Sequence, residues 1–335
     1  MEQIRQSRKI KPSSQELVDG ILAGNITALS RAITLVESTN ASHLANANEV
    51  INACLHHANK SVRIGITGVP GVGKSTFIEA FGKYLTKLGK KVAVLAVDPS
   101  STISQGSILG DKTRMEELVK DENAFIRPSA SGKTLGGVAR KTRESIILCE
   151  AAGFDTIIIE TVGVGQSETA VHSMVDFFLL LKISGAGDEL QGIKRGIMEM
   201  ADMIVINKAD GDNIKRANHA KAEFNRALHL FPAKPSGWMP TTATCSAITH
   251  AGIADVWQTI LQFLQLTKDN QYFYIKRKDQ NQYWLMETID EQLKQHFLNH
   301  AEIQQLLELN KKAVQNDEIS PFAAAQLLLE KYFGN

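Results

Sequence analysis

The spacing of apolar and polar positions changes character twice along the chain. Up to about residue 60, apolar side chains recur at helical spacing, as they do at Leu44, Ala47, Val50, Ile51 and Leu55. Further on, they gather into short and nearly continuous runs, and near the end the helical spacing returns. The pattern predicts an N-terminal helical extension at 1–60, a central domain at 61–270 and a C-terminal helical arm at 271–335.

The central part contains apolar runs of strand length. In chain order they read VRIGITG, KVAVLAVD, DTIIIETVG, DFFLLLKIS and DMIVINKAD. Most are apolar at successive rather than alternate positions, which is typical of parallel strands covered on both faces. Helical segments such as 75–89 and 136–153 lie between several of them. We therefore predict an α/β fold, with a doubly wound, mostly parallel sheet and helical extensions at both ends.

The C-terminal arm carries two clear helix signals. One apolar stripe with four-residue steps consists of Leu285, Ile289, Leu293 and Phe297. A later helix begins at Ser320 and Pro321, because serine is a favoured N-cap and proline a favoured first helical residue. The apolar stripe fits burial against a second subunit or against the chain's own central domain, and periodicity alone leaves both open.

Composition narrows the class of protein. The formal net charge of the 335 residues is +1, which gives no reason to expect a nucleic-acid or membrane partner. The longest apolar run, VDFFLLL, is far shorter than a membrane span. The N-terminus lacks an apolar signal core, and the three cysteines are far apart. These features predict a cytoplasmic protein with reduced, structural thiols.

The stretch GVPGVGKST has the pattern G-x-x-x-x-G-K-[ST] between a predicted strand and a predicted helix. Glycines in such a loop let several backbone N–H groups turn inward, and the helix adds the positive end of its dipole. Lys74 is expected to reach the β- and γ-phosphates, and Ser75 to bind Mg²⁺. The predicted phosphate-binding residues are Gly68, Val69, Pro70, Gly71, Val72, Gly73, Lys74, Ser75 and Thr76.

A second motif indicates which base is bound. Asn207, Lys208 and Asp210 form N-K-x-D after an apolar run, at the strand edge where α/β sheets bind ligands. A carboxylate at Asp210 can accept hydrogen bonds from guanine N1–H and its exocyclic amine, which adenine does not offer there. A backbone N–H near guanine O6 is expected from the later stretch CSA, which begins at Cys245. The candidate base-binding residues there are Ser246, Ala247 and Ile248. The motifs together favour GTP over ATP.

Carboxylates follow two of the apolar runs. Asp98 ends one predicted strand and Glu160 another, and carboxylates at such positions usually hold Mg²⁺ or its waters. For Asp98, a plain turn before Pro99 is an alternative reading. Many GTPases carry a glutamine directly after the glycine of this segment, but here Val164 stands in its place. We therefore expect slow intrinsic hydrolysis, completed by a partner or by another segment of the chain.

Several longer stretches resemble one family. GVPGVGKST, VDPSS, GSILGDKTRM, ETVGVGQSE, GAGDELQGIKRGIMEMAD and NKAD are similar to motifs of the MeaB-type GTPases. This family of SIMIBI-class P-loop proteins includes the methylmalonic aciduria type A protein and ArgK, once described as the LAO/AO transport kinase. The resemblance covers about residues 60–270. It implies a GTP-hydrolysing, homodimeric chaperone of adenosylcobalamin-dependent methylmalonyl-CoA mutase that gates cofactor loading and protects the mutase.

The resemblance also assigns residues. It places Ser75, Asp98, Asp111 and Glu160 around Mg²⁺, and it makes 184–196 a switch loop that communicates with the mutase. Lys194 in that loop is the candidate for completing the catalytic site with Lys74 and Glu160, although a solvated loop lysine is an equal alternative. The chain departs from the family pattern at Gln105 and Lys133, which leaves the backbone of those two loops open.

Two other functions are alternatives to the mutase chaperone. A GTPase that delivers nickel or cobalt would need a ligand cluster, and Cys54, His56 and His57 are close in sequence. Positions 54 and 56 of a helix point apart, however, and the chain has no C-x-x-C pair. A kinase acting on a transport protein is the other alternative, but no second acceptor-binding domain is visible.

Overall fold

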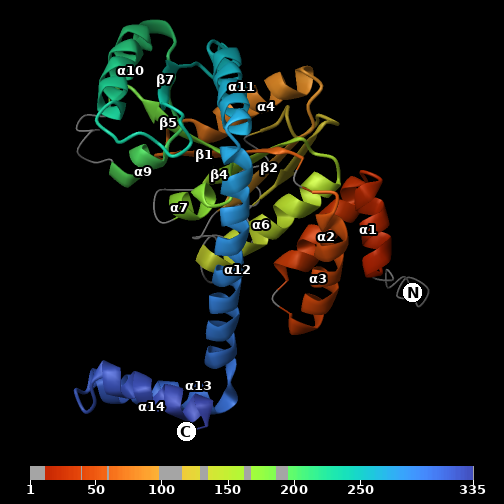
Figure 1. Cartoon of the computed structure of the whole chain (residues 1–335), viewed down its shortest axis with the longest axis vertical. Coiled ribbons are helices and arrows are strands. Elements are labelled where there is room, and N and C mark those ends of the chain that lie inside the picture. Colours follow the sequence, from red (N-terminus) through yellow and green to blue (C-terminus); the bar gives the residue numbers. More distant parts are fainter. Residues whose placement is uncertain are drawn as a thin grey trace, which may run out of the picture. The chain divides into compact units, whose positions relative to one another are not determined.

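The structure is a computed structural model of the chain, and it describes residues 12–38, 40–58, 60–97, 115–128, 135–161, 167–185 and 195–334. The chain divides at Gln280 into two compact units, Met1–Gln280 and Asn281–Asn335 (Figure 1). The first unit contains the sheet and the N-terminal helices, and the second contains helices only.

Seven parallel strands form the sheet of the first unit. They are β1 (Val62–Gly68), β2 (Val92–Val97), β3 (Ala124–Arg127), β4 (Thr156–Thr161), β5 (Phe177–Ile183), β6 (Met203–Asn207) and β7 (Thr241–Thr244). Their order across the sheet is β3-β2-β4-β1-β5-β6-β7, with every neighbouring pair parallel. From β1 the chain first forms β2 and β3 on one side, then returns to place β4 between β2 and β1, and finally adds β5, β6 and β7 on the other side. Strands on both sides of β1 confirm the predicted doubly wound α/β fold.

Helices cover both faces of this sheet. On one face, α4 (Lys74–Lys87) and α11 (Ile253–Asp269) share a core with Leu179 and Leu181 of β5. On the other, α9 (Arg195–Met200) and α10 (Ile214–Leu228) pack against Leu180 and against Ile204 of β6. Successive residues of one strand point to opposite faces, so continuous apolar runs are what a sheet covered on both sides requires.

Three N-terminal helices pack on one another and on α6 (Leu135–Ala151). They are α1 (Ser14–Leu22), α2 (Ile26–Glu37) and α3 (Ala41–Leu55). Ser13 caps α1 in a capping box with Glu16, and Asn25 caps α2. At the end of α2, the Glu37 carboxylate pairs with the guanidinium of Arg127 on β3. This pair joins the helical extension to the edge of the sheet.

Buried ion pairs join the amino ends of two strands to helices. Arg63 of β1 pairs with Glu150 of α6 at 2.9 Å, and both side chains are fully buried. Asp176, just before β5, pairs with Arg277 of α12 (Tyr272–Asn299) at 2.7 Å and also accepts the backbone N–H of Arg63 at 2.8 Å. The nearby guanidinium groups hold the pKa of Asp176 below its ordinary value, against the opposing effect of burial. The first turns of α12 are thereby bound to the sheet.

The second unit consists of the rest of α12, α13 (Ala301–Gln315) and α14 (Pro321–Phe333). Ser320 caps α14 through the N–H of Ala323, as its sequence predicts. Three of the four residues of the stripe predicted on α12 are exposed: Leu285 and Leu293 have 61% and 60% of their surface accessible, and Ile289 has 41%. The fourth, Phe297, is half-buried, and its ring meets that of Tyr332 edge-on with centroids 5.1 Å apart.

No helix within the described ranges is long and apolar enough to cross a membrane.

Candidate functional site

The loop at 68–76 connects β1 to α4 at the carboxyl edge of the sheet. A Cβ atom on Gly68 would lie 2.6 Å from the carbonyl oxygen of Leu181, so the backbone there has room for glycine only. Gly73 has φ +89° and is the N-cap residue of α4, and it makes no side-chain cap hydrogen bond. The first N–H groups of α4 are thus oriented to receive an anion at this end of the helix.

The ammonium group of Lys74 lies over the same loop. Its Nζ donates to the main-chain oxygen of Gly68 at 2.8 Å and to that of Val69 at 3.4 Å. The positive charge is therefore placed beside the backbone amides at the start of α4. A phosphate chain entering this loop would meet both kinds of donor at once.

Two oxygen ligands of the kind that Mg²⁺ prefers lie next to the loop. The hydroxyl of Ser75 donates to Oε1 of Glu160 at 3.4 Å, and Glu160 is only 3% exposed at the end of β4. Behind them, the hydroxyl of Thr161 donates to that of Thr67 at 2.8 Å, which joins the carboxyl ends of β4 and β1. A hydroxyl and a carboxylate are a suitable donor set for a hard divalent cation beside phosphates.

The N-K-x-D segment follows β6 and is bound to the phosphate loop. The amide Nδ2 of Asn207 donates to the main-chain oxygen of Val72 at 3.0 Å, and Nζ of Lys208 donates to that of Gly71 at 2.8 Å. Lys208 has a left-handed backbone with φ 58°, a conformation that is unusual for a residue other than glycine. Two segments far apart in the sequence therefore meet at the carboxyl edge of the sheet. Open α/β sheets bind ligands in a crevice outside this edge, and we call these two segments the nucleotide crevice.

The Asp210 carboxylate is oriented by a neighbour from the segment after β7. The hydroxyl of Ser246 donates to Oδ2 of Asp210 at 2.5 Å. The N–H of Ser246 donates to the main-chain oxygen of Ala251 at 3.0 Å, so this N–H is already used within the loop. Two residues therefore remain as candidates for the predicted N–H donor to guanine O6. They are Ala247, which is buried, and Ile248, which is 75% exposed.

The side chain of Cys245 makes a contact that the sequence did not predict. Its Sγ donates to Oδ1 of Asn207 at 3.4 Å, so the two ends of the Asn207 amide are fixed by different partners. Burial raises the pKa of the Cys245 thiol to about 12, which keeps its proton in place. The only sequence signal was its position directly before Ser246.

Several predicted residues lie outside the described residues. They are Asp98, Asp111 and Lys194, together with Gln105, Lys133 and Val164. The residues that the structure does bring together are those of the phosphate loop, Glu160, the N-K-x-D segment and the segment at 245–248.

The sequence cluster at Cys54 does not form a metal centre in the described part of the chain. No group of three or more His, Cys, Asp or Glu side chains there is arranged to hold a metal ion. Cys54 is buried, and this burial raises the pKa of its thiol to about 11. His56 and His57 are both exposed to solvent. A buried, protonated thiol fits a structural role better than metal binding.

Comparisons with known proteins identify the family of the chain. The family model described as "Methylmalonyl Co-A mutase-associated GTPase MeaB" matches residues 29–302. A "Putative GTPase" of Caulobacter vibrioides is 50% identical over 313 residues, covering 93% of this chain and 95% of that protein. "GTPase ArgK" of Escherichia coli is 44% identical over 315 residues, covering 94% of this chain and 95% of that protein.

Two further relatives extend the comparison. The "Methylmalonic aciduria type A homolog, mitochondrial" of Mus musculus is 45% identical over 326 residues, covering 94% of this chain and 79% of that protein. The crystal structure of an "LAO/AO transport system kinase" is 38% identical, covers 95% of this chain and 97% of its own, and superposes with a TM-score of 0.75. The chain belongs to the MeaB family of P-loop GTPases.

Proposed function

We propose that this GTPase is a chaperone of an adenosylcobalamin-dependent methylmalonyl-CoA mutase, whose cofactor loading it gates and whose active form it protects. The observation that carries the proposal is the family match over residues 29–302, since that family is described as associated with methylmalonyl-CoA mutase. The mouse relative, described as a methylmalonic aciduria type A homolog, supports the same pathway.

In this proposal the crevice binds GTP with its base beside the N-K-x-D segment and its phosphates in the loop. Asp210, oriented by Ser246, accepts the two guanine donors, and Asn207 keeps the base-binding segment against the phosphate loop. Lys74 exchanges its carbonyl partners for the β- and γ-phosphate oxygens.

Mg²⁺ would be held by the Ser75 hydroxyl and the Glu160 carboxylate, with Asp98 and Asp111 as further proposed ligands. Bound there, the ion neutralises charge on the phosphates. Glu160 is buried at a strand end, so a cation would also stabilise its negative charge. We also propose that Lys194 completes the catalytic site when the partner is bound.

We further propose that two copies associate through α12. Leu285, Ile289 and Leu293 form an exposed apolar stripe on this helix, and contact between such a stripe and water is unfavourable. A dimer with twofold symmetry would bury the stripe of each copy against that of the other.

A binding and turnover experiment tests the mutase proposal. The purified chain and a candidate mutase are mixed, complex formation is followed by size-exclusion chromatography, and GTP turnover is measured with each protein alone and with both. The proposal predicts a nucleotide-dependent complex and faster GTP turnover in the mixture than in the chain alone. Absence of both a complex and stimulation, with GTP binding intact, would leave a GTPase with a different partner. Turnover of ATP in preference to GTP would favour the kinase alternative.

A further inference from the structure

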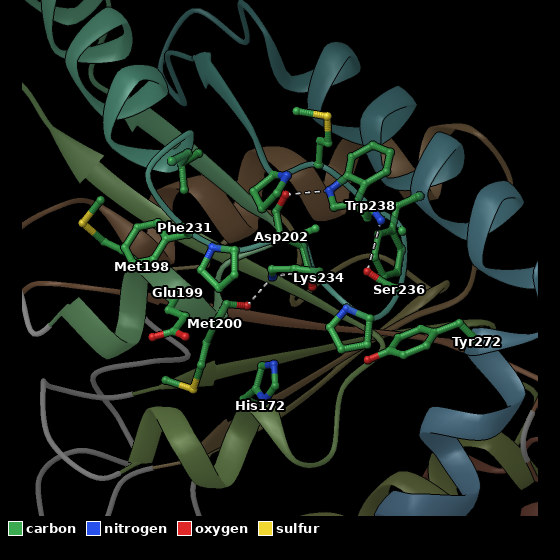
Figure 2. Close-up of a pocket in the computed structure, with 18 of the residues that line it drawn as sticks. His172, Met198, Glu199, Met200, Asp202, Phe231, Lys234, Ser236, Trp238 and Tyr272 are labelled. Atoms are coloured by element: carbon green, nitrogen blue, oxygen red, sulfur yellow. Dashed lines mark hydrogen bonds and ion pairs between the residues drawn. The ribbon is translucent and has the colours of Figure 1, made fainter.

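A cavity lies at the amino ends of the strands, at the opposite end of the sheet from the nucleotide crevice. Its volume is about 720 Å³, within the range of pockets that enclose small molecules. Its wall is made by the ends of α7 (Ser167–His172) and α9, by residues 228–240 after α10, and by the first turn of α12 (Figure 2). All of these residues belong to the first unit.

The position of the cavity separates it from GTP binding. Asp202 lines the cavity and comes immediately before β6, whereas Asn207 of the nucleotide crevice ends that strand. Five residues of parallel strand span about 16 Å. A molecule in this cavity would therefore occupy a site of its own.

The wall is largely apolar and is held in shape. Met198, Phe231 and Tyr272 surround the opening seen in Figure 2. The indole N–H of Trp238 donates to the main-chain oxygen of Asp202 at 2.9 Å, and its ring meets Phe263 edge-on with centroids 5.5 Å apart. A fixed aromatic wall lowers the entropic cost of binding a flat or chain-like apolar body.

One acidic group on the wall is already neutralised. Nζ of Lys234 donates to Oδ1 of Asp202 at 2.7 Å and to the main-chain oxygens of Met200 and Ala201 at 3.0 and 2.7 Å. All three N–H donors of this ammonium are used. The other lining carboxylate, Glu199, is exposed to solvent.

A second ammonium group on the wall has donors to spare. Within the described residues, Nζ of Lys276 donates to the main-chain oxygen of Asp176 at 2.9 Å, which uses one of its three N–H groups. The carboxylate of Asp176 is bound by Arg277 and does not hydrogen-bond to Lys276. Burial lowers the pKa of Lys276, and the nearby charges of Asp202 and Asp176 act against this effect. His172 also lines the cavity, and burial with the two nearby lysines lowers its pKa to about 4, so the imidazole is neutral at pH 7.

We propose that this cavity binds a small amphipathic molecule with an apolar body and one anionic group, a carboxylate or a phosphate, placed at Lys276. The apolar body lies against Trp238, Phe231 and Tyr272, and the anion accepts hydrogen bonds from the spare donors of Lys276. The neutral imidazole of His172 can add one more hydrogen bond without adding charge. This site is independent of the proposed mutase partner.

Dye binding to the full chain tests the proposal. The probes are anilinonaphthalene sulfonate, which combines an aromatic body with an anion, and the uncharged phenylnaphthylamine as its matched partner. Fluorescence titrations compare the wild type with Lys276→Met, with Ala233→Trp, which fills the cavity, and with Lys278→Met, an exposed control on the same helix. Binding of a fluorescent GTP analogue checks that each variant is folded.

The expected pattern separates charge from shape. Lys276→Met should weaken the sulfonate dye at least tenfold and leave the uncharged dye within about twofold. Ala233→Trp should weaken both at least tenfold, and Lys278→Met should weaken neither. Competition by decanoate and by decyl phosphate then tells which anion is preferred. Dye binding that Ala233→Trp leaves unchanged, or a sulfonate affinity that does not respond to Lys276→Met in a folded variant, would overturn the proposal.

Discussion

The contact between Ser246 and Asp210 leads to a quantitative prediction about base recognition. The hydroxyl of Ser246 donates to the Asp210 carboxylate at 2.5 Å. Both of the charge-assisted bonds proposed between this carboxylate and guanine need a group that only accepts hydrogen bonds. Asp210→Asn keeps the shape but replaces one acceptor oxygen with an NH₂ donor that faces a guanine donor. Bonds to a charged group are worth about 1.5–3 kcal/mol each, so a total loss of about 3 kcal/mol, or roughly 150-fold in GTP affinity, is expected.

The same change predicts a gain for a different base. Xanthine has a carbonyl where guanine has its exocyclic amine, so the new NH₂ of Asp210→Asn would have an acceptor to meet. Titration calorimetry with GTP and with xanthosine triphosphate measures both effects, and thermal unfolding checks the fold. Ser246→Ala is the matched control: it removes only the orienting hydroxyl, and about a two- to tenfold loss of GTP affinity is expected. An Asp210→Asn variant that binds GTP within threefold of the wild type would refute the reasoning.

Three further predictions concern stability and assembly. Arg277→Met leaves the buried carboxylate of Asp176 without its ion-pair partner. The free energy of unfolding, measured by chemical denaturation, should fall by about 3–5 kcal/mol, and a loss below about 1 kcal/mol would contradict the prediction. The pKa of His172 is about 4 in the folded chain and 6.5 ordinarily, so the unfolded chain binds the extra proton between these values. The stability that the neutral imidazole contributes is therefore complete above pH 6.5 and is lost as the pH falls towards 4. His172→Gln should reduce that loss by about 3 kcal/mol, and identical pH profiles for the two proteins would exclude this role. The double change Leu285→Glu and Leu293→Glu should give monomers in sedimentation velocity experiments. The control Leu230→Glu, at a position that is 81% exposed, should remain dimeric. Dimers in both variants, or monomers in the wild type, would contradict association through α12.

The sequence predicted the parts of the fold that a strong apolar pattern specifies. All five apolar runs are strands of the parallel sheet, because a strand covered on both faces must be apolar at nearly every position. The strand at 241–244 was missed because it reads TTAT, lies at the sheet edge and is only half-buried. The strand at 124–127 was missed because four residues are too few to show a period.

Periodicity predicts the helix at 41–55 but does not select its buried face. The sequence pattern on 41–55 included Leu44 and Leu55, yet both are exposed, while Cys54 is fully buried beside Val50. An amphipathic pattern identifies a face only to within about one residue on the helical wheel, and packing against α1, α2 and α6 selects the face that is used.

The candidate site was predictable where spacing along the chain carries the chemistry. The phosphate loop and the N-K-x-D segment are local motifs, so their residues could be named from the sequence. Their hydrogen bonds to each other, and those of Ser246 and Cys245, depend on the sheet order that brings β1, β6 and β7 to one edge. The cavity at the other edge combines residues from five helices and loops that share no motif, so only the folded chain displays it.

Nucleotide binding by the unmodified chain tests the central claim most directly. Titration calorimetry in the presence of Mg²⁺ is run with GTP and, separately, with ATP. If Asp210 selects the base and the loop at 68–76 holds the phosphates, one GTP binds per chain at least about 100-fold more tightly than ATP. Equal affinity for the two nucleotides, or no measurable binding of GTP, would contradict the account.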